Sequence, residues 1–192
     1  MNINDQLGRT LKAIKRDLEF AYVGAAQATV VGTASAGRRM TSLINQISTA
    51  VDAGSNSTDP LTEAKLLVAG QTAYTNGSSP SVLMIKPADS LITAGFAAAS
   101  GRNREIAQGK TLVNVVDLYV SPFGEYKVVL NRHMLTSVAL LIDPTMFKQC
   151  VLRPFSRTLL AKTGDADTHM VVGEYSCKHT NFADSVKITG LS

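Results

Sequence analysis

The stretch that decides the fold lies near the end of the chain and reads Leu152-Arg153-Pro154-Phe155, then Leu160-Ala161-Lys162-Thr163-Gly164-Asp165, then Val172-Gly173-Glu174-Tyr175, with Thr189-Gly190-Leu191 closing it. Residues 151–160 are rich in Val, Leu, Phe and Thr, which favours an extended strand. Residues 162–167 are turn formers, and Gly164 can take a positive φ. A second strand resumes over residues 169–180. The sequence therefore predicts a β-hairpin.

Both faces of the second predicted strand carry a mixture of apolar and polar side chains. Met170, Val172, Glu174, Ser176 and Lys178 alternate with Val171, Tyr175, Cys177 and His179. A strand that closes a monomer core has one uniformly apolar face. The mixed faces instead favour a surface on which other chains lie on both sides of the hairpin.

A long amphipathic helix is expected at the start of the chain. Its apolar residues recur at helical spacing over about six turns, and Asn2 or Asn4 is expected to cap it. The apolar residues are Leu7, Leu11, Ile14, Leu18, Ala21 and Ala25.

Between the helix and the hairpin, further helices and strands alternate. Asp59-Pro60 is expected to start a helix that Asn76-Gly77 ends, and Pro87 a second helix through Ala99. Strands are expected over 81–86, 114–121, 125–131 and 137–142, and one or two helical turns from Asp143-Pro144 through Gln149. Residues 29–36, 52–59 and 101–110 are expected to be loops, and 39–49 fits either a strand or a short helix. This mixture predicts the α+β class.

The ordered set of motifs resembles one family of tailed-bacteriophage major capsid proteins with the Hong Kong 97-type fold. The shared pattern in the hairpin is the Arg153-Pro154 pair, the Leu-Ala-Lys-Thr-Gly-Asp turn, the Gly-Glu-Tyr strand, Asn181 and the closing Ile-Thr-Gly-Leu. Upstream, the matching segments are Lys15 to Glu19, Ala36 to Met40, and Tyr119 to Gly124 with Asn131-Arg132.

The resemblance implies a long spine helix, an axial lobe around the capsomer axis and a peripheral lobe. Residues 1–35 are then expected to form the spine helix and its connection, 36–150 the axial lobe, 151–181 the peripheral hairpin and 182–192 a closing strand. Family members carry an N-terminal arm and an extended loop ahead of the spine helix. This chain starts at the helix, so it is expected to be the C-terminal part of a capsid subunit.

Composition and charge exclude several classes of protein. The chain has 192 residues, 45% of them hydrophobic, and no apolar run near the roughly 20 residues of a membrane span. Cys150 and Cys177 give no disulfide framework, and they are expected to be free thiols. The net charge of +4 is spread along the chain, without Trp or a basic stripe, which does not indicate a sequence-specific nucleic-acid reader.

No motif predicts catalysis, a cofactor or a metal. Residues 32–39 lack the Lys and the hydroxyl of a phosphate loop. Cys177 and His179 share a strand face but are too few for a stable zinc site. Asp165 and Asp167 lie on one turn, whereas paired catalytic carboxylates flank a cleft. A structural protein is therefore expected in place of an enzyme.

Four hairpin residues are the candidates for contacts between subunits: Arg153, Lys162, Asp165 and Glu174. Arg153 is expected to pair with a carboxylate of an adjacent subunit, because a guanidinium fork suits interface carboxylates. The alternative is a surface arginine that contributes little.

The expected function is that of a structural subunit of an icosahedral phage head. Its partners would be copies of itself in hexamers and pentamers, other capsid proteins and, without sequence preference, packaged DNA. The expected location is the virion, after assembly in the bacterial cytoplasm. One alternative is an encapsulin-like nanocompartment shell, and another is a small cytosolic α/β enzyme or ligand-binding module.

Overall fold

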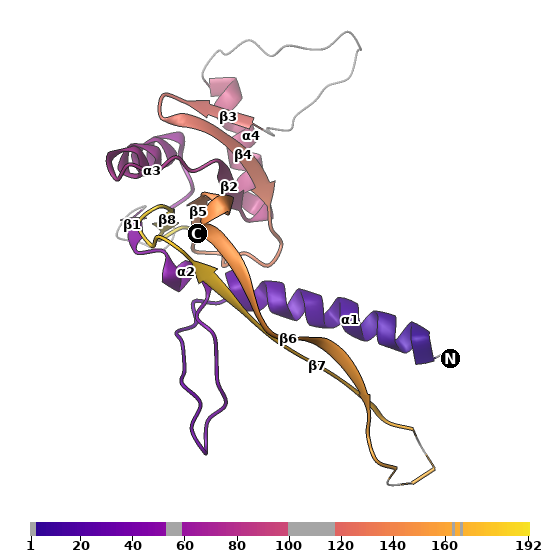
Figure 1. Ribbon diagram of the computed structural model, residues 1–192. Helices are drawn as coiled ribbons and strands as arrows, with labels where there is room; N and C mark the ends of the chain where they lie inside the picture. Colours follow the sequence, from indigo (N-terminus) through magenta and orange to yellow (C-terminus); the bar gives the residue numbers. More distant parts are fainter. Residues whose placement is uncertain (1–2, 53–58, 100–117, 163, 166) are drawn as a thin grey trace, which may run out of the picture.

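A mixed sheet of six strands forms the body of the protein (Figure 1). The computed structural model describes residues 3–52, 59–99, 118–162, 164–165 and 167–192. The strands lie in the order β1 (Thr49–Asp52), β8 (Val186–Thr189), β5 (Ala139–Ile142), β2 (Val82–Ile85), β4 (Gly124–Leu130) and β3 (Leu118–Ser121). β1 pairs with β8 and β2 with β4 in parallel, and the other neighbours are antiparallel.

Apolar residues cover both faces of this sheet. On one face, Leu141 of β5 and Leu83 of β2 pack with α3 (Glu63–Thr75) and with Phe96 of α4 (Pro87–Ala99). On the other face, Leu140 and Ile142 of β5 pack with the short helix α2 (Leu43–Gln46) and with Val23. The uninterrupted apolar runs Val82-Leu-Met-Ile and Ala139-Leu-Leu-Ile follow from this burial on both faces.

The first helix is present where the sequence predicts it. α1 (Ile3–Glu19) continues as a π-helical turn, η1 (Phe20–Gly24). A Cβ atom at Gly24 would lie 2.6 Å from the carbonyl oxygen of His133, so this close approach of two backbones requires glycine. Asn4 lies inside the helix, and Asn2 lies outside the described residues. No helix in the described part of the chain combines the length and apolar character needed to cross a membrane.

The other predicted elements fall largely where expected. The strands β2, β3 and β5 lie inside their predicted ranges, and β4 begins at Gly124, just before its predicted start at Glu125. Gly77 ends α3 with a φ of 76°, as its turn signal indicates. The undecided segment 39–49 contains the short helix α2. The predicted loop 101–110, most of loop 52–59 and strand residues 114–117 lie outside the described residues.

Two predicted boundaries are wrong. The helix α3 begins at Glu63 because the Thr62 side chain caps it, accepting from Lys65 N, whereas Asp59 bridges Leu191 and pairs with Lys65 at 3.8 Å. After Asp143 there is one 3₁₀ turn, η2 (Pro144–Met146), and no helix reaches Gln149. Strand β6 begins at Phe147 instead, since Phe147 and Lys148 pair with His179 and Lys178 of β7.

The hairpin of β6 (Phe147–Leu159) and β7 (His169–His179) projects from the body beside α1, with the loop 27–41 on its other side (Figure 1). Within β6 only Phe147 and Phe155 are half-buried, and the other eleven residues are exposed. The sequence-based expectation that the hairpin lies outside a monomer core is confirmed. Its tip is far from the sheet, so its strands are stabilised chiefly by each other.

A buried ion pair lies where β2 joins α4. Lys86 and Asp89 are 6% and 2% exposed, and Lys86 Nζ lies 3.5 Å from Asp89 Oδ1. Lys86 Nζ also donates to the carbonyl oxygens of Thr136, at 2.7 Å, and Ser192. Burial raises the pKa of Asp89, and the nearby Lys86 ammonium opposes that rise. The lysine thus connects β2 to the segments after β4 and β8.

Replacing Lys86 by methionine should destabilise the fold by about 3 kcal/mol, because the carboxylate of Asp89 would stay buried without its cation. Urea unfolding followed by circular dichroism measures this. The double variant Lys86→Met/Asp89→Leu should recover a large part of the loss. Equal instability of both variants would show that the lysine acts through its carbonyl contacts alone.

The sheet core and the hairpin should respond differently to the same truncation. Leu141→Ala removes a fully buried side chain and should lower the free energy of unfolding by about 2–5 kcal/mol. Leu152→Ala, at a residue 69% exposed, should change it by less than about 0.5 kcal/mol. A large effect of Leu152→Ala in the monomer would contradict the peripheral position of the hairpin.

Candidate subunit-interaction surface

The Arg-Pro-Phe and Gly-Glu-Tyr motifs lie opposite each other in the middle of the hairpin. Arg153 of β6 lies opposite Glu174 of β7 in the strand pairing, and the two side chains form an ion pair. The ring of Phe155 lies 4.6 Å from the ring of Tyr175, and Phe155 N donates to Tyr175 Oη at 3.0 Å. A Cβ atom at Gly173 would lie 2.5 Å from the Phe155 ring, so glycine leaves room for that ring.

The same motifs bend the hairpin. The pairing register shifts between Val151 and Arg153, and again between Arg153 and Ser156, so β6 carries two extra residues relative to β7. Pro154 lies in the second irregularity, where a residue without an N–H disrupts least. Each bulge adds twist, and the outer part of the hairpin curves away from the sheet (Figure 1).

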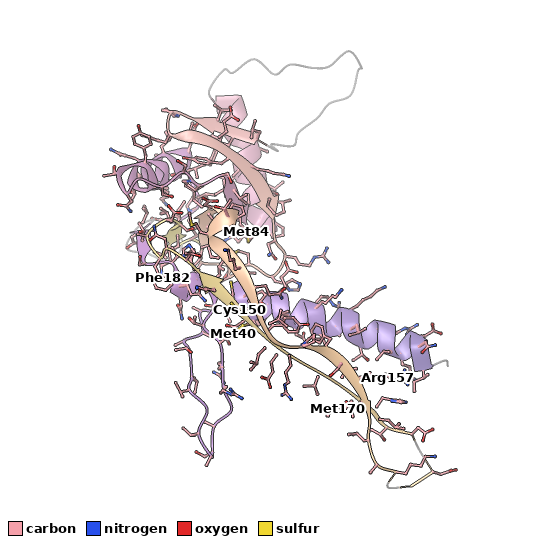
Figure 2. The ribbon with its side chains drawn as sticks, in the orientation of Figure 1. Met40, Met84, Cys150, Arg157, Met170 and Phe182 are labelled. Carbon is pink, nitrogen blue, oxygen red and sulfur yellow. The ribbon has the colours of Figure 1, made fainter. Side chains whose placement is uncertain are left out.

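The structure brings together two of the four predicted contact residues. Arg153 and Glu174 contact each other, so Arg153 has an acidic partner within its own chain. Lys162 and Asp165 lie at the tip, where Lys162 Nζ pairs with Asp167 Oδ1 at 3.0 Å and Asp165 is exposed. In Figure 2, Arg157 and Met170 mark this outer part, well away from Met84 and Phe182 in the body. A role for any of the four in subunit contacts stays a prediction.

The apolar face of α1 lines a groove with β6, β7 and the loop before α2. The groove has a volume of about 1020 Å³ and is lined by Ile14, Leu18, Val30, Met40, Leu152 and Phe155, among others. Figure 2 shows Met40 and Cys150 close to the place where the loop and the hairpin meet. We call α1, residues 27–40 and the β6–β7 hairpin together the hairpin–helix surface.

Sequence reasoning did not include these groove residues among the candidates. The signal that could have found them is the stripe of Leu7, Leu11, Ile14 and Leu18, which is strongly amphipathic. In the structure none of the residues of α1 is buried. Val31 is 81% exposed, and Val151, Leu159 and Met170 are exposed as well. Val31 and Val151 line the same groove, and exposed apolar residues that lie together indicate a contact site for another molecule.

Charged residues lie around this apolar groove. Arg38 and Arg39 come from the loop, Asp17 from α1 and Glu174 from β7. Apolar centres with charged margins are typical of protein–protein contact surfaces.

The His, Cys, Asp and Glu side chains of the described residues do not gather into a metal site. No group of three or more His, Cys, Asp or Glu side chains in the described ranges could hold a metal ion. Burial raises the pKa of the Cys177 thiol, and Cys150 adds to the rise, which disfavours the reactive thiolate form at Cys177. The ring of His179 stacks on the ring of Phe147.

Comparison with known proteins places this arrangement in a family. The model of the SU10 major capsid protein family matches residues 1–192. The chain belongs to this family. A curated relative, the major capsid protein of Escherichia phage Phieco32, is 31% identical over 148 residues, which are 72% of this chain and 42% of the relative. The chain thus spans less than half the length of that relative.

Solved structures show the same fold at low sequence identity. The SrpI encapsulin from Synechococcus elongatus PCC 7942 matches with a TM-score of 0.62 and 10% identity, over all of this chain and 66% of its own. A structure of Gordonia phage Cozz matches with a TM-score of 0.58 and 15% identity, over 99% of this chain and 64% of its own. The α+β, Hong Kong 97-type fold predicted from the sequence is confirmed.

The pairing of Arg153 with Glu174 makes a prediction for this capsid-family chain. Arg153→Ala should change the free energy of unfolding of the monomer by less than about 1 kcal/mol, because the pair is exposed to solvent. If Arg153 also contacts a neighbouring subunit, the same variant should weaken association several-fold. Urea unfolding measures the first effect and sedimentation velocity the second, and Lys127→Ala, at an exposed residue of β4 outside the hairpin–helix surface, is the matched control. Unchanged association in Arg153→Ala would remove Arg153 from the subunit contacts.

Proposed function

We propose that this chain is a self-associating structural subunit, or the C-terminal part of one, of an icosahedral bacteriophage head. The observation that carries the proposal is the hairpin–helix surface. A strand of 13 residues and a helix of 17 residues together contain no buried residue in the single chain. An isolated two-stranded hairpin is only marginally stable in water, so a second chain on this surface would stabilise it.

Copies of the same chain are the partner that the family suggests. Closed rings form when one patch of a subunit contacts a complementary patch of the next, and capsomers of five and six subunits repeat that contact. We assign the spine helix to α1, the axial lobe to residues 36–150 and the peripheral hairpin to residues 151–181. The extension of β6 back to Phe147 places the foot of the hairpin four residues before that boundary.

Contact with packaged DNA is the second part of this proposal. The basic residues Arg9, Lys12, Lys15 and Arg16 of α1 lie outside the apolar stripe that lines the groove. Binding through phosphates alone would carry no sequence preference and would weaken steeply with salt. We place the subunit in the virion, after assembly in the bacterial host. Other capsid proteins are further possible partners in the same shell.

The alternatives have less support. The fold similarity to an encapsulin concerns architecture, and fold alone does not establish what a shell encloses. The family match instead favours a phage head. A small enzyme would need convergent titratable groups in an enclosed pocket, whereas the described groove is lined by apolar residues and separate charges.

The proposal predicts that assembly depends on apolar residues of the hairpin–helix surface. Leu152→Asp should abolish large particles, because it places a charge in a contact that excludes water. The thermal midpoint of the unassembled chain should stay within a few degrees, since Leu152 is exposed there. Negative-stain microscopy and sedimentation velocity, on the product expressed with any upstream coding sequence of its locus, measure particle size.

Leu91→Asp is the matched control. Leu91 lies on α4 and is 79% exposed, yet it is not part of the hairpin–helix surface. We expect it to leave particles intact. If both variants disrupted particles equally, the principal subunit contact would not be specific to the hairpin. A uniform monomer for the unmodified product would remove the capsid role.

A further inference from the structure

A buried histidine lies where the hairpin meets the sheet. His179 is the last residue of β7 and is 3% exposed. Its ring stacks face to face on Phe147, the first residue of β6, with centroids 4.2 Å apart and planes at 3°. Phe182 approaches the same imidazole edge-on, at 5.9 Å. Phe147 and His179 lie opposite each other at the foot of the hairpin, and Phe182 lies in the turn that follows β7.

This cluster connects the hairpin to the body. Phe147 packs against the core cluster that contains Leu140 and Ile142 of β5. Next to the stacked pair, Thr180 N donates to the carbonyl oxygen of Met146 at 3.0 Å. Ser185, fully buried, leads directly into β8. The stacked pair therefore lies at the point where both strands of the hairpin join the body.

The surroundings suit a neutral imidazole better than a charged one. His179 Nε2 lies 3.4 Å from Ser185 Oγ, and Nδ1 has no hydrogen-bond partner among the described residues. Burial lowers the pKa of His179, while the Asp184 carboxylate and the nearby backbone of Gln46 oppose the shift. Protonation would put a positive charge on a ring that is 3% exposed, where the cost of burial outweighs the opposing effects of Asp184 and Gln46.

Few charged groups face the ring from the elements around it. Asp184, in the turn before β8, is buried, and its Oδ2 has no partner among the described residues. Lys187 of β8 donates to the carbonyl oxygen of Ile44 at 3.1 Å. Lys148 of β6 and Lys178 of β7 are exposed, and α2 contains no ionisable residue. Asp184 is thus the carboxylate whose charge opposes the lowering of the His179 pKa.

We propose that the stack of His179 on Phe147 is a proton-sensitive clasp, which holds the foot of the hairpin against the sheet while the ring is neutral and releases it when the ring is protonated. Protonation places a charge among aromatic rings and core residues, at a cost that stacking on Phe147 offsets only in part. Opening the foot of the hairpin exposes the ring to water and removes that cost. The clasp acts within one chain and does not depend on self-association.

The direction of the pH effect follows from the lowered pKa. Below the ordinary histidine pKa of about 6.5, the opened form binds a proton that the closed form excludes. The clasp is therefore fully closed above that pH. It weakens as the pH falls through that value, until the pH reaches the lowered pKa of the closed state.

Hydrogen–deuterium exchange of the 192-residue chain tests the clasp directly. Protection factors, which correct for the intrinsic pH dependence of exchange, are compared for the Thr180 amide and for amides in β5. From pH 7.5 to 5.5, protection at Thr180 should fall by up to about tenfold per pH unit below the ordinary pKa, while β5 stays protected. His179→Phe, which keeps a stacked ring without a proton, should remove this response. His169→Gln, at the tip end of β7, should keep it.

Constant protection at Thr180 in the unmodified chain would overturn the proposal, and so would a pH response that survives in His179→Phe. If His179→Phe does not fold, an NMR titration of the His179 ring in the unmodified chain decides instead. A pKa at or above the ordinary value would overturn the proposal. A lowered pKa, with the Thr180 amide signal shifting along the same titration curve, would support it.

Discussion

The pairing of β5 with β8 is the constraint on which the rest of the structure depends. The two strands lie next to each other inside the six-stranded sheet, and Ala139, Leu141, Val186 and Ile188 are fully buried there. The hairpin of β6 and β7 connects these two strands, so both of its ends start from the core. Because β5 and β8 are held in the sheet, they fix the direction in which the hairpin leaves it. The exposed hairpin can therefore keep one orientation.

Sequence reasoning predicted the elements whose signals are local. Alternation and turn residues located the hairpin, and helical spacing located α1. It misplaced the starts of α3 and β6, because a Thr62 cap and the pairing of Phe147 with His179 outweighed the signals of Asp59-Pro60 and Asp143-Pro144. Lys86 also donates to the carbonyl oxygens of Thr136 and Ser192, and no local pattern encodes these tertiary contacts. The stripe of α1 was predicted, but its residues stay only half-buried in a groove with the hairpin, and this arrangement is visible only in the fold.

The motifs that carried the family resemblance have a common physical role. Arg153 with Glu174, and Phe155 with Tyr175 over Gly173, are cross-strand pairs in an element that lacks a core. Such pairs are the unit of stabilisation in a sheet. In a buried strand many apolar sequences satisfy the same burial, but in this hairpin each pair needs its particular side chains. This explains why several of the recognisable motifs lie in the exposed hairpin, whereas β2 and β5 consist of aliphatic residues.

The place of β8 between β1 and β5 also governs the order of events during synthesis. The inner strand β8 comes from residues 186–189, and it pairs with the edge strand β1 from residues 49–52. A growing chain can form α1 and the β3–β4 hairpin as they leave the ribosome, but it cannot close its core until residues 186–189 have emerged. A partly translated chain therefore exposes the apolar faces of β2 and β5, and the hairpin–helix surface acquires its final orientation only once translation has passed β8.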